Sequence, residues 1–351
     1  MSRHLWTCWR RHRHIGATGD TSDRRNDPRF RFLTDTVATA GANRSGRHLN
    51  PDRARRRFFC RLKGFDMTQD YVALLGTKGG PAIRPGSSMP TSNLFCLNGV
   101  QIVVDCGLGV TRGLIDQGMQ LRDLSLIFIT HLHSDHYLEL GPLLHTAWTA
   151  GLQTRVDIYG PEGIDVYWDG FLASMKADID LRIEDEGRPD LRDLVAVHVI
   201  DAGHVFERDG VSVSAIRTEH PPLTDTFALS FKTGETHVVF SGDTARLEAL
   251  EAFARGADLL IHEAMLESAL PALMARIGNG SEKLMEHWLR AHTFAHDAAI
   301  TARNAEVKRL ALSHLIPSDD PDYGPKDWQD ACIGHYGGEL IVGYDGVRIE
   351  L

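Results

Sequence analysis

Four side chains that commonly bind metal ions lie within six residues of this chain. The segment Thr130-His131-Leu132-His133-Ser134-Asp135-His136 directly follows residues 124–129, a continuous apolar run of strand length. A neutral imidazole can bind zinc through one ring nitrogen while the other nitrogen makes a hydrogen bond. The pattern therefore predicts a buried strand that ends in a rigid loop of metal ligands, and it disfavours a polar turn with solvated histidines.

The histidine pattern HLHSDH resembles the HxHxDH signature of the metallo-β-lactamase fold family, whose remaining ligands each follow a further strand. Three strand-like segments occur downstream in the required order, and Ser241-Gly242-Asp243-Thr244 resembles the family's SGDT. The resemblance covers roughly residues 71–351. Seven ligand positions are filled, in the order His131, His133, Asp135, His136, His220, Asp243 and His314.

The resemblance implies an α/β fold, the four-layer αββα metallo-β-lactamase sandwich, with two Zn²⁺ ions as cofactors. In the family, the positions of His131, His133 and His220 hold the first ion. Those of Asp135, His136 and His314 hold the second, and that of Asp243 bridges the pair. Two such ions hold a hydroxide between them, because a bound metal lowers the pKa of water towards neutrality. The implied reaction is attack by this metal-bound hydroxide, with Asp135 holding or deprotonating the nucleophile.

The residues at two ligand positions argue against two branches of the family. The best-known class B β-lactamases carry cysteine where Asp243 stands, which argues against a β-lactamase. Flavodiiron oxidoreductases usually carry glutamate where His133 stands, which argues against redox iron. These two residues therefore favour a hydrolase other than a β-lactamase.

The motif Ala291-His292-Thr293 resembles the HxT element of ribonuclease Z and its arylsulfatase-like relatives. The resemblance makes His292 a catalytic residue that protonates the leaving oxygen. The alternative is a helix N-terminus capped by Thr293. Two further residues are expected to support the centre. Asp105 lies in a turn resembling the family's DxG and would support the metal loop, whereas Glu263 would either orient a ligand or catalytic histidine or close a strand end.

The substrate is expected to be a small-molecule ester. Ribonuclease Z inserts a long arm that holds tRNA between the positions of His220 and Asp243, but only 22 residues separate them here. Met285 and Trp288 lie just before His292 and are expected to line an apolar substrate pocket. We therefore expect an aryl sulfate, phosphodiester or lactone as substrate and no nucleic acid as partner. The alternative enzyme is a ribonuclease Z-type tRNA 3′-processing endonuclease.

The first 66 residues differ sharply in composition from the rest. Residues 1–66 contain 15 arginines and one lysine against six aspartates and no glutamate, a formal charge of +10, so residues 67–351 carry −19 of the total of −9. We expect residues 1–66 to be a disordered leader or a mis-assigned start, and residues 67–351 to form the hydrolase domain. A different class, a non-catalytic nucleic-acid binder that uses this leader, is disfavoured by the complete ligand set.

The cysteines and hydropathy bear on location. Five scattered cysteines without paired spacing favour a reduced, cytoplasmic setting over a disulfide framework. No apolar run approaches the length of a bilayer span, so no membrane partner is expected. A homodimer is left open.

Overall fold

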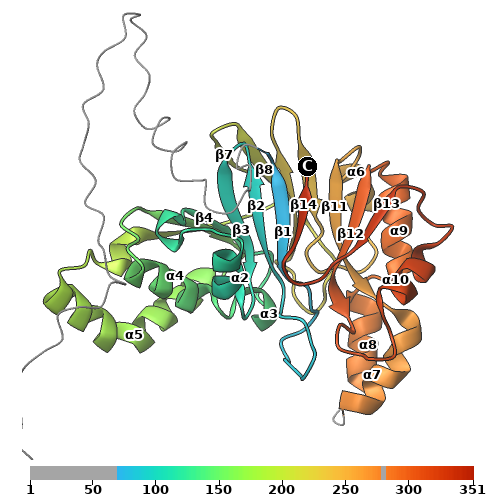
Figure 1. The fold of residues 1–351 in the computed structure, drawn as a ribbon, viewed down its shortest axis with the longest axis horizontal. Coiled ribbons are helices and arrows are strands. Elements are labelled where there is room, and N and C mark those ends of the chain that lie inside the picture. Colours follow the sequence, from blue (N-terminus) through green and yellow to red (C-terminus); the bar gives the residue numbers. More distant parts are fainter. Residues whose placement is uncertain (1–68, 278–281) are drawn as a thin grey trace, which may run out of the picture. The chain divides into compact units, whose positions relative to one another are not determined.

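The computed structural model describes residues 69–277 and 282–351 (Figure 1). The expected leader of residues 1–66, and the boundary after it, lie outside the described residues. Two seven-stranded sheets form the centre of the described domain. The first sheet has the order β14-β1-β2-β3-β4-β5-β6 and the second the order β13-β12-β11-β10-β9-β8-β7.

Each of the two sheets consists of seven short strands. The first sheet consists of β1 Tyr71–Gly76, β2 Ser92–Leu97, β3 Val100–Cys106, β4 Leu126–Phe128, β5 Val156–Gly160, β6 Val195–Val199 and β14 Val347–Glu350. The second consists of β7 Gly203–Arg208, β8 Val211–Arg217, β9 Phe227–Lys232, β10 His237–Phe240, β11 Leu259–Met265, β12 Arg309–Ile316 and β13 Glu339–Val342. β2 and β3 pair in antiparallel register and form a hairpin across Asn98-Gly99. Both turn residues have positive φ, as a two-residue hairpin turn requires.

Alternation along the strands explains the layers. Val72 and Leu74 of β1 point into the apolar core between the two sheets, where they meet side chains such as Phe231. Tyr71 and Ala73 point to the opposite face and pack under helices. Both faces of β1 are buried, so the strand is apolar throughout. Alternate residues point to opposite faces of the sheet and therefore belong to different layers.

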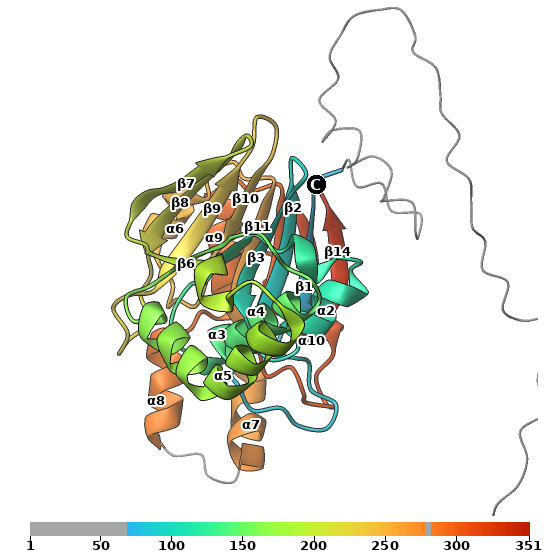
Figure 2. The ribbon, with the colours of Figure 1, turned by 90° about the vertical axis from the view of Figure 1, so that its left-hand side faces the viewer.

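Helices cover the outer face of each sheet (Figures 1 and 2). The first sheet carries α2 Val110–Asp116, α4 Leu140–Thr149 and α5 Ile164–Glu186, and the second carries α6 Glu248–Phe253, α9 Ala295–Asn304 and α10 Pro325–Cys332. The expected four-layer αββα sandwich is therefore confirmed. Two more helices, α7 Leu270–Ile277 and α8 Glu282–Ala291, extend beyond one end of the sheets.

The acidic residues 178–186 lie in a long helix that covers the first sheet. They belong to the 23-residue helix α5, which packs on the first sheet through Ile164, Trp168 and Ile179. Charge pairs one turn apart, such as Arg182 with Asp178, stabilise the exposed side of this helix. Among the described residues, no helix is both long and apolar enough to cross a bilayer.

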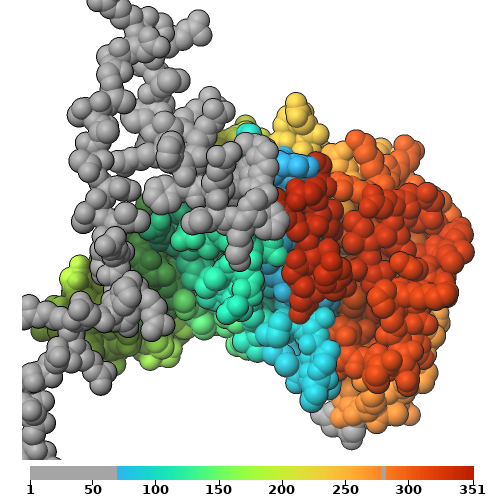
Figure 3. Space-filling model, in the orientation of Figure 1, coloured from blue at the N-terminus to red at the C-terminus, as the bar shows by residue number. Residues whose placement is uncertain are grey.

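Pairing of β1 with the last strand closes one edge of the first sheet. Tyr71 of β1 lies opposite Glu350 of β14 in antiparallel register. The dark red surface of this C-terminal segment is exposed on the face drawn in Figure 3. The first and last described strands are thus neighbours, although they lie at opposite ends of the described sequence.

Candidate metal centre

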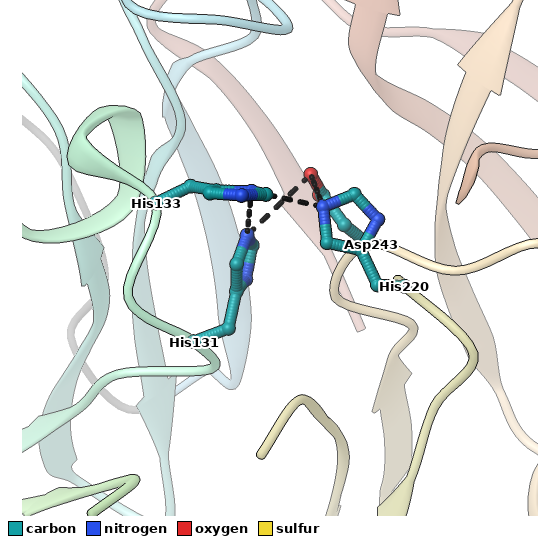
Figure 4. Close-up of side chains that lie close together, drawn as sticks. All are labelled: His131, His133, His220 and Asp243. Atoms are coloured by element: carbon teal, nitrogen blue, oxygen red, sulfur yellow. Dashed lines mark hydrogen bonds and ion pairs between the residues drawn. The ribbon is translucent and has the colours of Figure 1, made fainter. Parts of the chain in front are cut away.

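The structure brings all seven predicted ligand side chains together. One group comprises His131, His133, His220 and Asp243, and a second comprises Asp135, His136 and His314. Within each group the candidate ligand atoms lie within 4.8 Å of one another. Figure 4 shows the first group, with the imidazoles converging on the Asp243 carboxylate.

Strand ends explain this convergence. The loop after β4 carries His131 and His133, and the short helix α3 (Ser134–Tyr137) carries Asp135 and His136. The other three ligands follow β8 and β10 or lie near the end of β12, namely His220, Asp243 and His314. Parallel neighbours in each sheet place the carboxyl ends of their strands at one edge, so residues far apart in sequence meet there.

The carboxylate of Asp243 lies between the two groups. Its Oδ2 is 3.7 Å from the Nε2 atoms of both His131 and His220, 3.4 Å from Nε2 of His136 and 3.1 Å from Nε2 of His314. A single carboxylate that reaches imidazoles of both groups occupies the position of a bridging ligand. The geometry agrees with the bridging role that the resemblance implied for Asp243.

Hydrogen bonds prepare specific ring nitrogens for metal binding. His136 Nδ1 lies 2.8 Å from Asp105 Oδ2, and His220 Nδ1 lies 2.7 Å from the carbonyl oxygen of Ala291. Each Nδ1–H donates outward, so Nε2 is left as the free ligand atom. Two buried atoms, His136 Nε2 and Asp243 Oδ1, have no hydrogen-bond partner among the described residues. Imidazole nitrogen and carboxylate oxygen are ligands that suit zinc, so the residues fit a metal pair.

The electrostatics of the centre also suit cations. Burial would raise the pKa of Asp243, but His314, His136 and His131 lower it well below its usual range. Burial would lower the pKa of His314, but Asp243 and Asp135 raise it to about 10. Asp135 and Asp243 are therefore ionised, and His136 and His314, whose pKa values are raised, hold protons beside them. A metal ion takes the place of such protons when it binds.

Asp105 supports the ligand loop from beneath. Its side chain is fully buried, and its Oδ1 accepts a hydrogen bond from the backbone N–H of Thr130 at 2.8 Å, while Oδ2 holds His136. The predicted supporting role of Asp105 agrees with these contacts.

Two residues of the centre adopt the left-handed backbone conformation, which is strained for any residue other than glycine. Asp105 has a φ of 62° and His314 has a φ of 46°. The left-handed region costs a non-glycine residue about 1 kcal/mol or more, although aspartate tolerates it better than most. Both residues keep this conformation in the buried interior.

Glu263 and His292 form a buried pair beside the ligands. Glu263 Oε2 lies 2.9 Å from His292 Nδ1, and Glu263 Oε1 accepts the backbone N–H of Thr244 at 2.6 Å. Burial raises the pKa of Glu263 well above its usual range and lowers that of His292 to about 4. The His292 ring stacks on that of His314 with centroids 5.5 Å apart. Of the two readings of Glu263, these contacts favour the one that orients a histidine.

His287 was not predicted as a site residue, yet it lies over the first ligand group. Helix α8 carries it, and its ring centroid is 5.9 Å from that of His220, 5.8 Å from that of His292 and 6.3 Å from that of His133. It makes no hydrogen bond with any described residue. His287 precedes His292 by five residues. This spacing does not show that the two rings are close, because their distance depends on the turn between α8 and α9. Sequence patterns therefore missed His287.

Met285 and Trp288 are half-buried in a small apolar cluster at the α7–α8 end of the molecule. They pack against Met265, Leu270 and Ile316. This packing gives both side chains a structural role. Their predicted part in an apolar substrate pocket stays a prediction, as does the cytoplasmic location.

Comparisons with known proteins add to this geometry. Residues 72–317 match the family described as anti-Pycsar protein Apyc1. Ribonuclease Z of Mycobacterium bovis (strain BCG / Pasteur 1173P2) is 30% identical over 283 residues, which cover 80% of this chain and 98% of that protein. The metallo-β-lactamase fold protein YhfI from Bacillus subtilis superposes with a TM-score of 0.58 at 20% identity, covering 81% of this chain and 100% of the other. The short form of human tRNase Z gives a TM-score of 0.56 at 22% identity, covering 80% and 98%.

These comparisons overturn one expectation. A small-molecule ester as substrate, with nucleic acid excluded, is wrong in view of the relatives, which are named as nucleases that act on RNA. The short connection between His220 and Asp243 removes one means of holding tRNA, but it leaves the bond-cleaving centre intact.

Proposed function

Because the chain belongs to the anti-Pycsar protein Apyc1 family and is a metallo-β-lactamase superfamily hydrolase that acts on ester bonds, we propose that it is a phosphodiesterase of ribonuclease Z type. Its proposed substrate is RNA, and its proposed cofactors are two zinc ions. The relatives named ribonuclease Z support RNA over the small esters first expected.

One observation carries this proposal. Asp243 reaches imidazoles of both ligand groups, and the buried pair of Glu263 and His292 lies beside them. A phosphodiester needs charge neutralisation on its non-bridging oxygens and a proton for its leaving oxygen. The two parts of the site meet these two needs.

The zinc ions and Asp135 would have different roles at the phosphate. Bound zinc ions would polarise the phosphate and lower the pKa of water to near neutrality. Asp135 is held by the backbone N–H of Gly80, which donates to its Oδ2 at 2.8 Å. Burial opposes ionisation of Asp135, but His136 and His314 lower its pKa below the usual value. The Asp135 carboxylate is therefore an anion, which accepts a hydrogen bond from the attacking water and orients it.

The proton for the leaving oxygen comes from the Glu263–His292 pair. Burial favours the neutral forms of both groups, so Glu263 donates its proton in a hydrogen bond to His292 Nδ1, and Nε2–H faces the site. As water attacks phosphorus and passes a proton to Asp135, the P–O bond breaks and the leaving oxygen takes the Nε2 proton. The Glu263 proton then passes to Nδ1, so no isolated charge develops on the histidine.

His287 is assigned to substrate binding. Its place over His133, His220 and His292, with no hydrogen bond to any described residue, leaves a ring N–H for an oxygen of the bound nucleotide. Because a neutral imidazole donates without repelling metal ions, it suits this position.

The proposal is tested with the zinc-loaded full chain. We expect it to cleave a precursor tRNA or an unstructured RNA oligonucleotide, and we expect a chelator to abolish cleavage until zinc is restored. Asp243→Ala should abolish it too, whereas Asp169→Asn, on the exposed face of α5, should not. Hydrolysis of bis(p-nitrophenyl) phosphate without cleavage of either RNA would refute RNA as the substrate.

A further inference from the structure

Three basic side chains gather on the side of the second ligand group. Lys78 and Arg84 lie in the loop after β1, and Arg276 lies at the end of α7. The two arginines meet at one carboxylate, since Arg84 Nη1 is 3.4 Å from Asp319 Oδ2 and Arg276 Nη2 is 3.5 Å from Asp319 Oδ1. Arg276 also lies 3.2 Å from a carboxylate oxygen of Asp320. The two arginines thus share two acidic partners.

Lys78 lacks a carboxylate partner. Its residue is only 5% exposed, and its Nζ donates to the carbonyl oxygen of Gly79 at 2.8 Å. Within the described part of the chain, no carboxylate lies within 4.0 Å of this ammonium group. Burial lowers the pKa of Lys78 despite the attraction of Asp319. Burial of an ammonium group with only one neutral acceptor is unfavourable, because the group loses its hydration and gains no opposite charge. A bound anion would supply that charge.

The Lys78 loop is seated against the metal ligands. Gly80 donates its N–H to Asp135, and a Cβ atom added to Gly79 would lie 2.9 Å from the ring of His314. Figures 1 and 2 show this loop and α7 at the same end of the sandwich. The basic cluster therefore borders the second ligand group, whereas His287 lies over the first.

We propose that Lys78, Arg84 and Arg276 form a subsite for a phosphate group next to the scissile bond. This inference rests on the proposed function and names the part of the RNA that the site would hold. Three basic side chains against the carboxylates of Asp319 and Asp320 give a formal charge of +1, which complements the single negative charge of a backbone phosphate. The two arginine side chains are about one-third exposed (35%), and their planar groups suit phosphate oxygens.

The subsite predicts how the enzyme ranks small RNAs. The full zinc-loaded chain should cleave pUpU or UpUp with a kcat/KM at least about tenfold higher than UpU, since a charge-assisted hydrogen bond contributes that much. Lys78→Met should remove this preference, so that the phosphorylated dinucleotides are cleaved no faster than UpU by the variant. Lys326→Met, an exposed lysine paired with Asp330, is the matched control and should keep the preference. Equal rates on all three substrates in the wild-type chain would overturn the subsite.

A second measurement separates the subsite from the proposed reaction. After zinc removal, the full chain should bind inorganic phosphate, and Lys78→Met should weaken that binding at least about tenfold without lowering the melting temperature, because it removes a buried charge that lacks a carboxylate partner. If phosphate binds this way but no RNA is cleaved, the subsite stands and the ribonuclease proposal fails. If Lys78→Met leaves phosphate affinity unchanged, the subsite is wrong even if RNA is cleaved.

Discussion

Nδ1 of His292 lies 2.9 Å from Oε2 of Glu263, and both side chains are buried beside the candidate metal ligands. The pair joins the end of β11 to the segment between α8 and α9. One residue of the pair thus comes from the second sheet and the other from the helical hairpin that extends beyond it.

This pairing predicts a dependence on the leaving group. Glu263→Gln keeps the size and polarity of the side chain but removes the proton that we assign to the pair. We expect turnover of phosphodiesters with poor leaving groups to fall about 100-fold or more, and turnover of bis(p-nitrophenyl) phosphate to fall far less. His292→Ala should show the same pattern. The measurement is kcat across a series of leaving-group pKa values, and equal losses across the series would rule out proton donation.

The bridging position of Asp243 predicts a change in metal content. The wild-type chain should hold about two zinc equivalents, and Asp243→Ala should lose at least one of them together with turnover. Elemental analysis after dialysis measures the content. Asp169→Asn serves as the control, because its side chain is exposed on α5 and should leave both metal content and rate intact. A full complement of zinc in Asp243→Ala would contradict the ligand assignment.

The place of His287 predicts a binding defect. His287→Ala should raise KM for RNA about tenfold, which corresponds to one lost hydrogen bond to a charged group, and change kcat little. His204→Ala alters an exposed histidine of β7 and should change neither constant. A fall in kcat with KM unchanged would instead place His287 in the chemical step.

Buried His262 predicts acid sensitivity. Burial lowers its pKa to about 4, although its hydrogen bond to the Glu263 carbonyl opposes the shift. The unfolded state takes up a proton near pH 6.5 and the folded state does not, so the free energy of unfolding falls as the pH drops from 6.5 to 4. The fall is about 3 kcal/mol, and it stops below about pH 4.

Replacement of this histidine tests the assignment. His262→Asn keeps a donor but does not titrate, so urea unfolding should show a smaller loss of stability between pH 7 and 4.5 than in the wild type. His204→Asn should retain the full loss. An identical pH profile in His262→Asn would show that other groups cause the acid sensitivity.

Sequence patterns revealed the parts of the site that depend on short segments. The ligand loop follows a strand because an apolar run and its polar end are adjacent in the chain, so His131 and Asp135 could be assigned directly. The distant ligands needed the family resemblance, since nothing local marks His220 as part of the same centre. Lys78 and His287 escaped prediction, because their roles depend on how loops and helices from separate regions pack around the ligands.

The fold was predictable to a similar degree. Strands that end in ligands stood out by their apolar runs, whereas β13 and β14 are short and half-exposed. Helix α5 is hard to recognise in the sequence because its charged residues conceal its buried positions, which lie at Ile164, Trp168 and Ile179. Pairing between charges on one helix face is a weak signal in a sequence.

The positive φ angles of Asp105 and His314 have a consequence for redesign. A sequence chosen only to stabilise this backbone would place glycine or asparagine at both positions, because these residues relieve the strain. The natural chain keeps an acid and an imidazole there instead. Redesign for heat resistance that follows backbone preference alone would therefore remove a ligand and its support first, and would yield a more stable protein without its metal centre.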